Sequence, residues 1–222
     1  MIDSLRNTSG VTAHQRDDLV RKISRLGGDW YAQDSANSQL KPANPQFLYT
    51  LDILHEAIAN SRQVLFYYGD YDSDKQLHRR KRNDGSDRDY LINPYYVVCT
   101  NGRYYLIGNI DKYDDLSHYR IDRIMDIQPL ETPAKPLNSV TDSENTIDLQ
   151  KYVTDHPYMY HGKPMEQRIR INRKGINDVL DWFGMESMFE NEDGEWVDAV
   201  VTADESSTEY WKKRYEEYLY LN

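Results

Sequence analysis

The chain has 222 residues, a net charge of −10 and a mean hydropathy of −0.85. This length holds one large or two small domains, and we expect two because the residue pattern changes after residue 149. No apolar run approaches the roughly 18 residues of a membrane-spanning helix, and the N-terminus lacks the apolar segment of a secretory signal, which predicts a cytoplasmic protein without a membrane role. The negative charge argues against coating nucleic acid by bulk electrostatics, although a local basic patch could still bind it.

Chemistry typical of enzymes is missing from the sequence. The single cysteine, Cys99, excludes an internal disulfide, and the apolar strand pattern around it predicts a buried, inert thiol in a reducing compartment. The six histidines are scattered, and no Walker loop, Rossmann glycine fingerprint or nucleophile elbow occurs. Residues 70–74 resemble the start of a calcium loop, but Lys75 and Lys81 stand where such a loop needs glycine and glutamate. We therefore expect no enzyme, no metal site and no cofactor.

Two helices are predicted before the first strand. Residues 12–26 place four aliphatic side chains at helical spacing, so this helix has one apolar face that must pack on something. Residues 29–46 form a polar connector, in which Trp30 and Tyr31 are expected to anchor the chain against a neighbour. Residues 47–61 are predicted as a second helix that leads into the sheet.

Short alternating segments then predict five antiparallel strands. A hairpin-like excursion separates the first strand from the other four. It consists of the basic run at 77–82 and a turn at Asp84-Gly85. A helix followed by five short strands predicts a small closed barrel, because closure removes the exposed edges of such strands. The predicted strands are residues 64–68, 89–99, 103–109, 117–122 and 125–131.

The sequence HYRIDR, beginning at His118, carries the most unusual chemistry. Period-2 alternation puts Tyr119 and Ile121 towards a core, and His118, Arg120 and Asp122 on the opposite face. The Arg120 guanidinium can present a planar fork to a phosphate or a base edge, and His118 can add charge below about pH 6.5. The alternative is an exposed cross-strand ion pair worth at most about 1 kcal/mol.

Basic and aromatic residues leave further interpretations open. Tyrosine occurs 19 times against 4 phenylalanines, which fits either half-buried strand surface or a stacking platform. Tyr104 and Tyr105 face opposite ways, so one is expected in the core, and the other could add roughly 1–3 kcal/mol for each base stacked on it. The basic run of the excursion fits either a solvated hairpin tip or a loop that contacts phosphate; it consists of Arg79, Arg80, Lys81 and Arg82.

The C-terminal third follows a different order. Pro133, Pro136 and many polar residues predict a linker before it. The segments that follow have the β-α-β-β-α order of a ferredoxin-like α+β domain, whose last strand is lost or barely kept in residues 218–221. They are a strand at 165–171, a helix at 175–183, a hairpin of 186–190 and 196–202 around Asp193-Gly194, and a helix at 206–218.

Residues 46–132 resemble the WYL domain. Its Trp-Tyr-Leu motif appears as Tyr104-Tyr105-Leu106, and further matches are Tyr68 at a strand end, Asn93-Pro94-Tyr95, the segment Gly102 to Gly108 and the segment His118 to Ile124. The resemblance implies an Sm-like or SH3-like five-stranded barrel of a bacterial transcriptional regulator, with a winged helix-turn-helix before it and a ferredoxin-like extension after it. That DNA-reading domain is absent from the sequence, so we expect either a fragment or a shortened protein, with DNA contacted only through such a domain.

The expected architecture is therefore mixed α and β. It comprises an N-terminal helical linker at 1–46, the WYL barrel at 47–132, a linker at 133–149 and a ferredoxin-like extension at 150–222. The resemblance implies an effector-binding, homodimeric region whose ligand is an anionic small molecule, a nucleotide or nucleic acid. Alternatives are direct binding of single-stranded nucleic acid and a dimerisation scaffold without ligand. The ligand-binding residues that the resemblance implies are Tyr68, Tyr105, His118, Arg120, Asp122 and Arg123, with possible phosphate contacts from Arg79, Arg80, Lys81 and Arg82.

Overall fold

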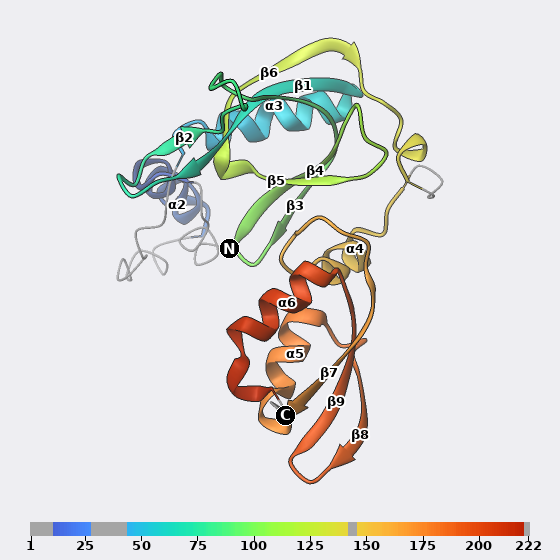
Figure 1. Ribbon diagram of the computed structural model, residues 1–222. Coiled ribbons are helices and arrows are strands. Elements are labelled where there is room, and N and C mark those ends of the chain that lie inside the picture. The colour runs from blue at the N-terminus through green and yellow to red at the C-terminus, as the bar shows by residue number, and fades with distance from the viewer. Residues whose placement is uncertain (1–10, 28–43, 142–145, 220–222) are drawn as a thin grey trace. The chain divides into compact units, whose positions relative to one another are not determined.

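The computed structural model describes residues 11–27, 44–141 and 146–219 (Figure 1). The chain divides into two compact units, Met1–Asn145 and Thr146–Asn222, each with a hydrophobic core of its own. The boundary between the units falls inside the predicted linker at 133–149. The predicted anchors Trp30 and Tyr31 lie outside the described residues. No helix in the described residues is long and apolar enough to cross a membrane.

Two helices precede the sheet of the first unit, as predicted. Helix α2 (Ala13–Gly27) begins with a capping box, in which the backbone N–H of Gln15 donates to the Thr12 hydroxyl and the Gln15 side chain accepts from the N–H of Thr12. Helix α3 (Phe47–Ala59) ends two residues earlier than predicted, because Ser61 adopts a left-handed conformation at φ 49°. Helix α3 packs against the sheet of the first unit.

Six antiparallel strands form the sheet of the first unit. They run in the order β2-β1-β3-β4-β5, and β6 also pairs with β1. Strand β1 is therefore the centre, because it pairs with three other strands. Their bounds are β1 (Arg62–Tyr71), β2 (Leu77–Arg79), β3 (Asp89–Thr100), β4 (Arg103–Ile110), β5 (Ser117–Arg120) and β6 (Ile124–Pro133).

The prediction of a closed barrel is wrong. A 3₁₀ helix, η2 (Ile121–Arg123), replaces the last two residues of the predicted strand at 117–122. In the described residues β5 pairs with β4 and β6 pairs with β1, but no ladder joins β5 to β6. Strand β5 has only four residues, and the 3₁₀ turn that follows it takes the chain out of the extended conformation, so its backbone groups point along the chain instead of across to a neighbouring strand. The sheet therefore stays open between β5 and β6.

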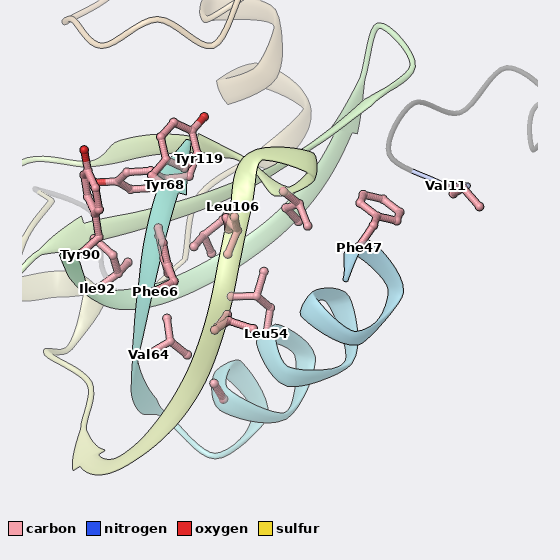
Figure 2. Close-up of a cluster of buried hydrophobic side chains, with 14 residues drawn as sticks. Val11, Phe47, Leu54, Val64, Phe66, Tyr68, Tyr90, Ile92, Leu106 and Tyr119 are labelled. Atoms are coloured by element: carbon pink, nitrogen blue, oxygen red, sulfur yellow. The ribbon is translucent and has the colours of Figure 1, made fainter. Parts of the chain in front are cut away.

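Tyrosines take part in the core of the first unit as well as its surface (Figure 2). The ring of Tyr119 lies 5.4 Å from Phe66, 5.5 Å from Tyr68 and 5.7 Å from Tyr90, each in an edge-on arrangement. Such aromatic pairs contribute about 0.5–1.5 kcal/mol each beyond the area they bury. Below this cluster, aliphatic side chains of the sheet contact helix α3 around the buried Leu54.

The prediction of a buried cysteine is wrong. Cys99 is exposed, because alternation along β3 turns its neighbour Val98 inwards and Cys99 outwards. Partial burial still raises the pKa of its thiol, so the thiolate is disfavoured.

The second unit is a three-stranded antiparallel sheet with helices. Its strands run in the order β7-β9-β8, and helices α5 and α6 share a core with the sheet around the fully buried Trp211. Helix α4, which the sequence pattern did not predict, begins where the Asp148 side chain accepts from the N–H of Lys151. The bounds are α4 (Leu149–Asp155), β7 (Met165–Asn172), α5 (Ile176–Phe183), β8 (Met188–Asp193), β9 (Trp196–Ala203) and α6 (Glu205–Arg214), with short 3₁₀ helices η3 (Leu137–Ser139) before the unit and η4 (Arg173–Gly175) and η5 (Glu216–Tyr218) within it.

Candidate functional site

Arg120 and Asp122 form a bidentate ion pair where β5 ends. The Arg120 Nε lies 3.0 Å from Asp122 Oδ1, and its Nη2 lies 2.6 Å from Oδ2. The prediction that Asp122 faces outwards is wrong: its side chain is only 3% exposed, because η2 breaks the strand alternation after Arg120. The Arg120 backbone N–H also donates to the Tyr68 hydroxyl at 3.0 Å. This arginine is thus held at both its main chain and its side chain.

Asp70, at the end of β1, is shared by two arginines. Its carboxylate accepts from Arg80 Nε at 2.6 Å and Nη2 at 3.1 Å, and from Arg123 Nη1 at 3.1 Å. The hydrogen bonds from Arg80 and the charge of both guanidinium groups hold the pKa of Asp70 below its usual value, despite partial burial. The Asp70 side chain is 50% exposed, so water reaches it. We call these three residues, together with the neighbouring Arg120–Asp122 pair, the arginine cluster.

The remaining predicted ligand residues lie around this cluster. The Tyr68 ring lies 4.9 Å from the Arg80 guanidinium carbon, and burial raises the pKa of the Tyr68 phenol. Tyr105 is buried and stands opposite Arg120 in the β4–β5 ladder. His118 is half-buried, two residues before Arg120 on β5, and pairs with Ile107 in that ladder.

Sequence reasoning missed two members of the cluster. Asp70 was considered only as a calcium ligand, although it lies two residues after Tyr68 and so extends from the same strand. Tyr71 was not singled out; burial raises the pKa of its phenol, and the nearby Asp122 carboxylate raises it further. Neither residue could be assigned without the contacts that β1 makes with η2 and with the excursion. The contact with η2 brings together residues about 50 positions apart in the sequence.

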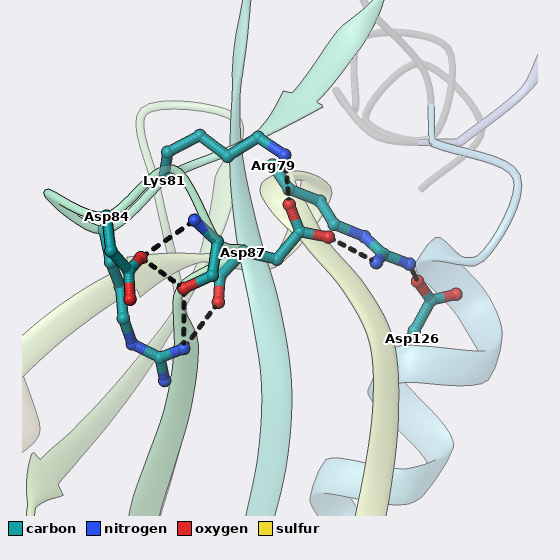
Figure 3. Close-up of polar contacts among 7 residues, drawn as sticks. Arg79, Lys81, Asp84, Asp87 and Asp126 are labelled. Carbon is teal, nitrogen blue, oxygen red and sulfur yellow. Dashed lines mark hydrogen bonds and ion pairs between the residues drawn. The ribbon is translucent and has the colours of Figure 1, made fainter.

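The basic run of the excursion is neutralised by the unit's own carboxylates (Figure 3). Arg79 binds Asp87 at 2.8 Å and also binds Asp126, while Lys81 binds Asp87 at 2.5 Å. Arg79 further stacks its guanidinium carbon 4.1 Å from the centre of the Tyr67 ring. The other two members are paired as well, Arg80 with Asp70 and Arg82 with Asp89.

Tyr104 is the core-facing member of the Tyr-Tyr-Leu motif. Its ring packs edge-on against Phe47 of α3, with centroids 5.6 Å apart. Tyr104 is half-buried, whereas Tyr105 lies on the other face of β4 and is buried. Neither ring is an exposed platform for stacking.

The described residues contain no group of three or more histidine, cysteine, aspartate or glutamate side chains placed to hold a metal ion. In the stretch that resembles a calcium loop, Asp70 binds arginines and the Asp74 carboxylate accepts from the Gln76 N–H at 2.8 Å. These carboxylates therefore serve pairing and turn formation.

Comparison with known families identifies the first unit. Residues 49–129 match the WYL domain, so this chain carries a WYL domain where its sequence motifs indicate one. The match covers α3 except its first two residues, the six-stranded sheet except the end of β6, and the arginine cluster described above.

Among solved structures, the chain is similar to the proteasome accessory factor B/C (PafBC) of Arthrobacter aurescens, with 12% sequence identity and a TM-score of 0.35. The alignment covers 90% of this chain but 29% of that protein. No curated protein matches the chain.

Proposed function

We propose that the first unit is the effector-binding region of a transcriptional regulator, and that its ligand is an anion engaging Arg80 and Arg123. The regulatory role follows from the WYL domain. The choice of arginines rests on one observation: a single carboxylate, Asp70, faces two guanidinium groups. One positive charge in this trio is left without a counter-charge, which favours the approach of a further anion.

Exposure separates the exchangeable ion pair from the fixed one. Asp70 is half exposed, so a phosphate or carboxylate from outside can compete for its two arginines, whose forks suit bidentate binding. Asp122 is buried against Arg120 and cannot be displaced without stranding a charge. We therefore assign Arg120 a positioning role: its backbone holds the hydroxyl of Tyr68, the ring next to Arg80.

Ligand binding at the arginine cluster would change the contacts of the excursion directly. Arg80 follows β2, so a ligand that replaces Asp70 changes the contact between the excursion and β1. A ligand that favours one arrangement shifts the population towards it. In the regulator that we propose, a homodimer would convert this shift into a changed spacing of attached DNA-binding domains.

Calorimetric titration of the full chain with ATP and with a single-stranded oligonucleotide tests the proposal. Arg123→Ala should weaken binding at least about tenfold, because a charge-assisted hydrogen bond contributes roughly 1.5–3 kcal/mol. Asp70→Asn should tighten binding, because it removes the competing carboxylate. Arg62→Ala is the matched control. Arg62 lies on β1, as Asp70 does, but it pairs with the exposed Glu131, away from the arginine cluster.

The salt dependence of the same titrations separates the two ligand classes. A single strand should bind with an affinity that falls steeply as salt rises, in proportion to the phosphates neutralised, whereas ATP should show a shallower dependence. If neither probe binds, or if Arg123→Ala and Asp70→Asn leave the affinities unchanged, the arginine cluster is excluded as the ligand-binding site. A scaffold without ligand would then be favoured.

For the second unit we infer a ferredoxin-like domain with a shortened last strand. The sheet order β7-β9-β8 and the helices α5 and α6 support this inference. A single antiparallel bridge joins Ile171 of β7 to Leu219, at the edge where the fourth strand of that fold would lie.

A further inference from the structure

A concave surface of the first unit lies apart from the arginine cluster. It is an open pocket of about 400 Å³ between the returning arm of the excursion, the start of β3 and the end of β4. This volume lies in the range of pockets that hold small molecules. Neither Asp70, Arg80 nor Arg123 lines it, so it goes beyond the function proposed above.

The cations of this pocket are not all neutralised, in contrast to those of the basic run. Arg82 pairs with Asp89, and Asp111 accepts a hydrogen bond from the buried Asn93 amide at 3.3 Å. Arg88 and Lys112 have no carboxylate partner among the described residues. Arg88 and Lys112 therefore face the pocket without an ion-pair partner, and the three cations of the lining outnumber its two carboxylates by one.

Aromatic rings hold these two cations in place of carboxylates. The Arg88 guanidinium carbon lies 4.9 Å from the centre of the Tyr90 ring, and the Lys112 Nζ lies 4.7 Å from that of Tyr113. A cation over a ring face is attracted to it but keeps its full charge and its N–H donors. Both side chains thus remain able to bind an anion.

Beside the cations the pocket has an apolar wall. Leu91 is 39% exposed, the half-buried Ile110 lies beside it, and Tyr90 backs onto the aromatic core of the sheet. Exposed aliphatic surface next to unpaired charges suits a ligand that carries an anion and an apolar group, because each part then finds its complement.

We propose that this pocket binds a small phosphate monoester with an aryl or alkyl group, its phosphate on Arg88 and Lys112 and its apolar group on Leu91 and Ile110. A phosphate monoester presents three strong acceptor oxygens, so it can accept hydrogen bonds from both cations at once, whereas a carboxylate presents only two oxygens.

Calorimetric titration of the full chain with phenyl phosphate tests this assignment. Saturable binding is expected, at least about tenfold tighter than that of inorganic phosphate, since the phenyl ring would bury apolar surface worth roughly 25 cal/mol per Å². Arg88→Ala and Lys112→Ala should each weaken binding at least about tenfold through lost charge-assisted hydrogen bonds. Leu91→Gln should bring the affinity for phenyl phosphate close to that for inorganic phosphate.

Arg103→Ala is the matched control, because Arg103 is an exposed arginine at the start of β4 that does not line the pocket. It should bind phenyl phosphate like the wild-type protein, and circular dichroism should show that every variant keeps the wild-type fold. The assignment is overturned if phenyl phosphate does not bind, if it binds no better than inorganic phosphate, or if folded Arg88→Ala and Lys112→Ala variants bind it as tightly as Arg103→Ala does.

Discussion

Two aspartates of the first unit differ in exposure, and this difference determines what each carboxylate does. Asp122 is buried with one arginine, whereas Asp70 is half exposed between two. A buried charge needs its partner, because the lost hydration is not recovered elsewhere. An exposed carboxylate exchanges its partners with water and solutes at little cost. The first pair therefore stabilises the turn after β5, and the second is open to competition.

Removing the buried carboxylate should be costly. We expect Asp122→Ala to lower the free energy of unfolding by about 3 kcal/mol, because it leaves the Arg120 guanidinium without its partner. Urea titration followed by circular dichroism measures this. Glu131→Ala, which breaks an exposed pair with Arg62, should cost at most about 1 kcal/mol. Equal costs for the two variants would show that Asp122 is not a structural charge.

Acid should release the excursion. Hydrogen bonds from Lys81 and then Arg79 hold the pKa of Asp87 below its usual value of 3.8. A carboxyl whose pKa is lower in the folded state contributes stability above pH 3.8 and loses it as the pH falls towards the folded-state pKa. The melting temperature of wild type should exceed that of Asp87→Asn at neutral pH, and the gap should shrink below pH 3.8. A gap that stays constant in acid would mean that ionisation of Asp87 is irrelevant.

At the scale of secondary-structure elements, Arg79 joins the excursion to the rest of the first unit. Arg79 binds Asp87 within the excursion and also Asp126 on β6, whose side chain and backbone N–H bind Gln46 just before α3. Lys81 binds Asp87 alone. Arg79 therefore connects three elements, and Lys81 only stiffens one.

This arrangement predicts a local effect of one substitution. Arg79→Ala should speed amide hydrogen exchange in residues 77–89 while leaving β3 and β4 protected, because local opening costs less than global unfolding. Lys81→Ala, which removes a cation from the same carboxylate, should change exchange much less. Similar exchange in both variants would argue that the excursion is held by the β1–β2 ladder and not by Arg79.

The strands were predictable because alternation is a local signal, and the predicted segments 89–99 and 103–109 differ from β3 and β4 by one residue at an end. The turn at 121–123 was not predictable from the sequence, because the alternation of apolar and polar residues continues through Ile121 and Asp122 although the backbone leaves the strand. Barrel closure failed with it, because closure depends on that turn. The role of Asp70 required a contact across 53 residues, and no local pattern carries such information.

The whole molecule consists of two units with separate cores, one around Leu54 and Phe66 and the other around Trp211. Limited proteolysis should therefore cut first near the boundary at residues 141–148 and yield two resistant fragments, because each core protects its own chain segments. Mass spectrometry of the early products tests this. Early cleavage within β3 or β9, before any cut near the boundary, would contradict two independent units.

The distribution of tryptophan between the two units has a practical consequence. Trp182, Trp196 and Trp211 all belong to the second unit, and Trp30 is the only other tryptophan in the sequence. After Trp30→Phe, fluorescence excited at wavelengths that tyrosine does not absorb would arise from tryptophan in the second unit alone. A denaturation experiment could then follow the unfolding of the second unit by its own chromophore, without any added label.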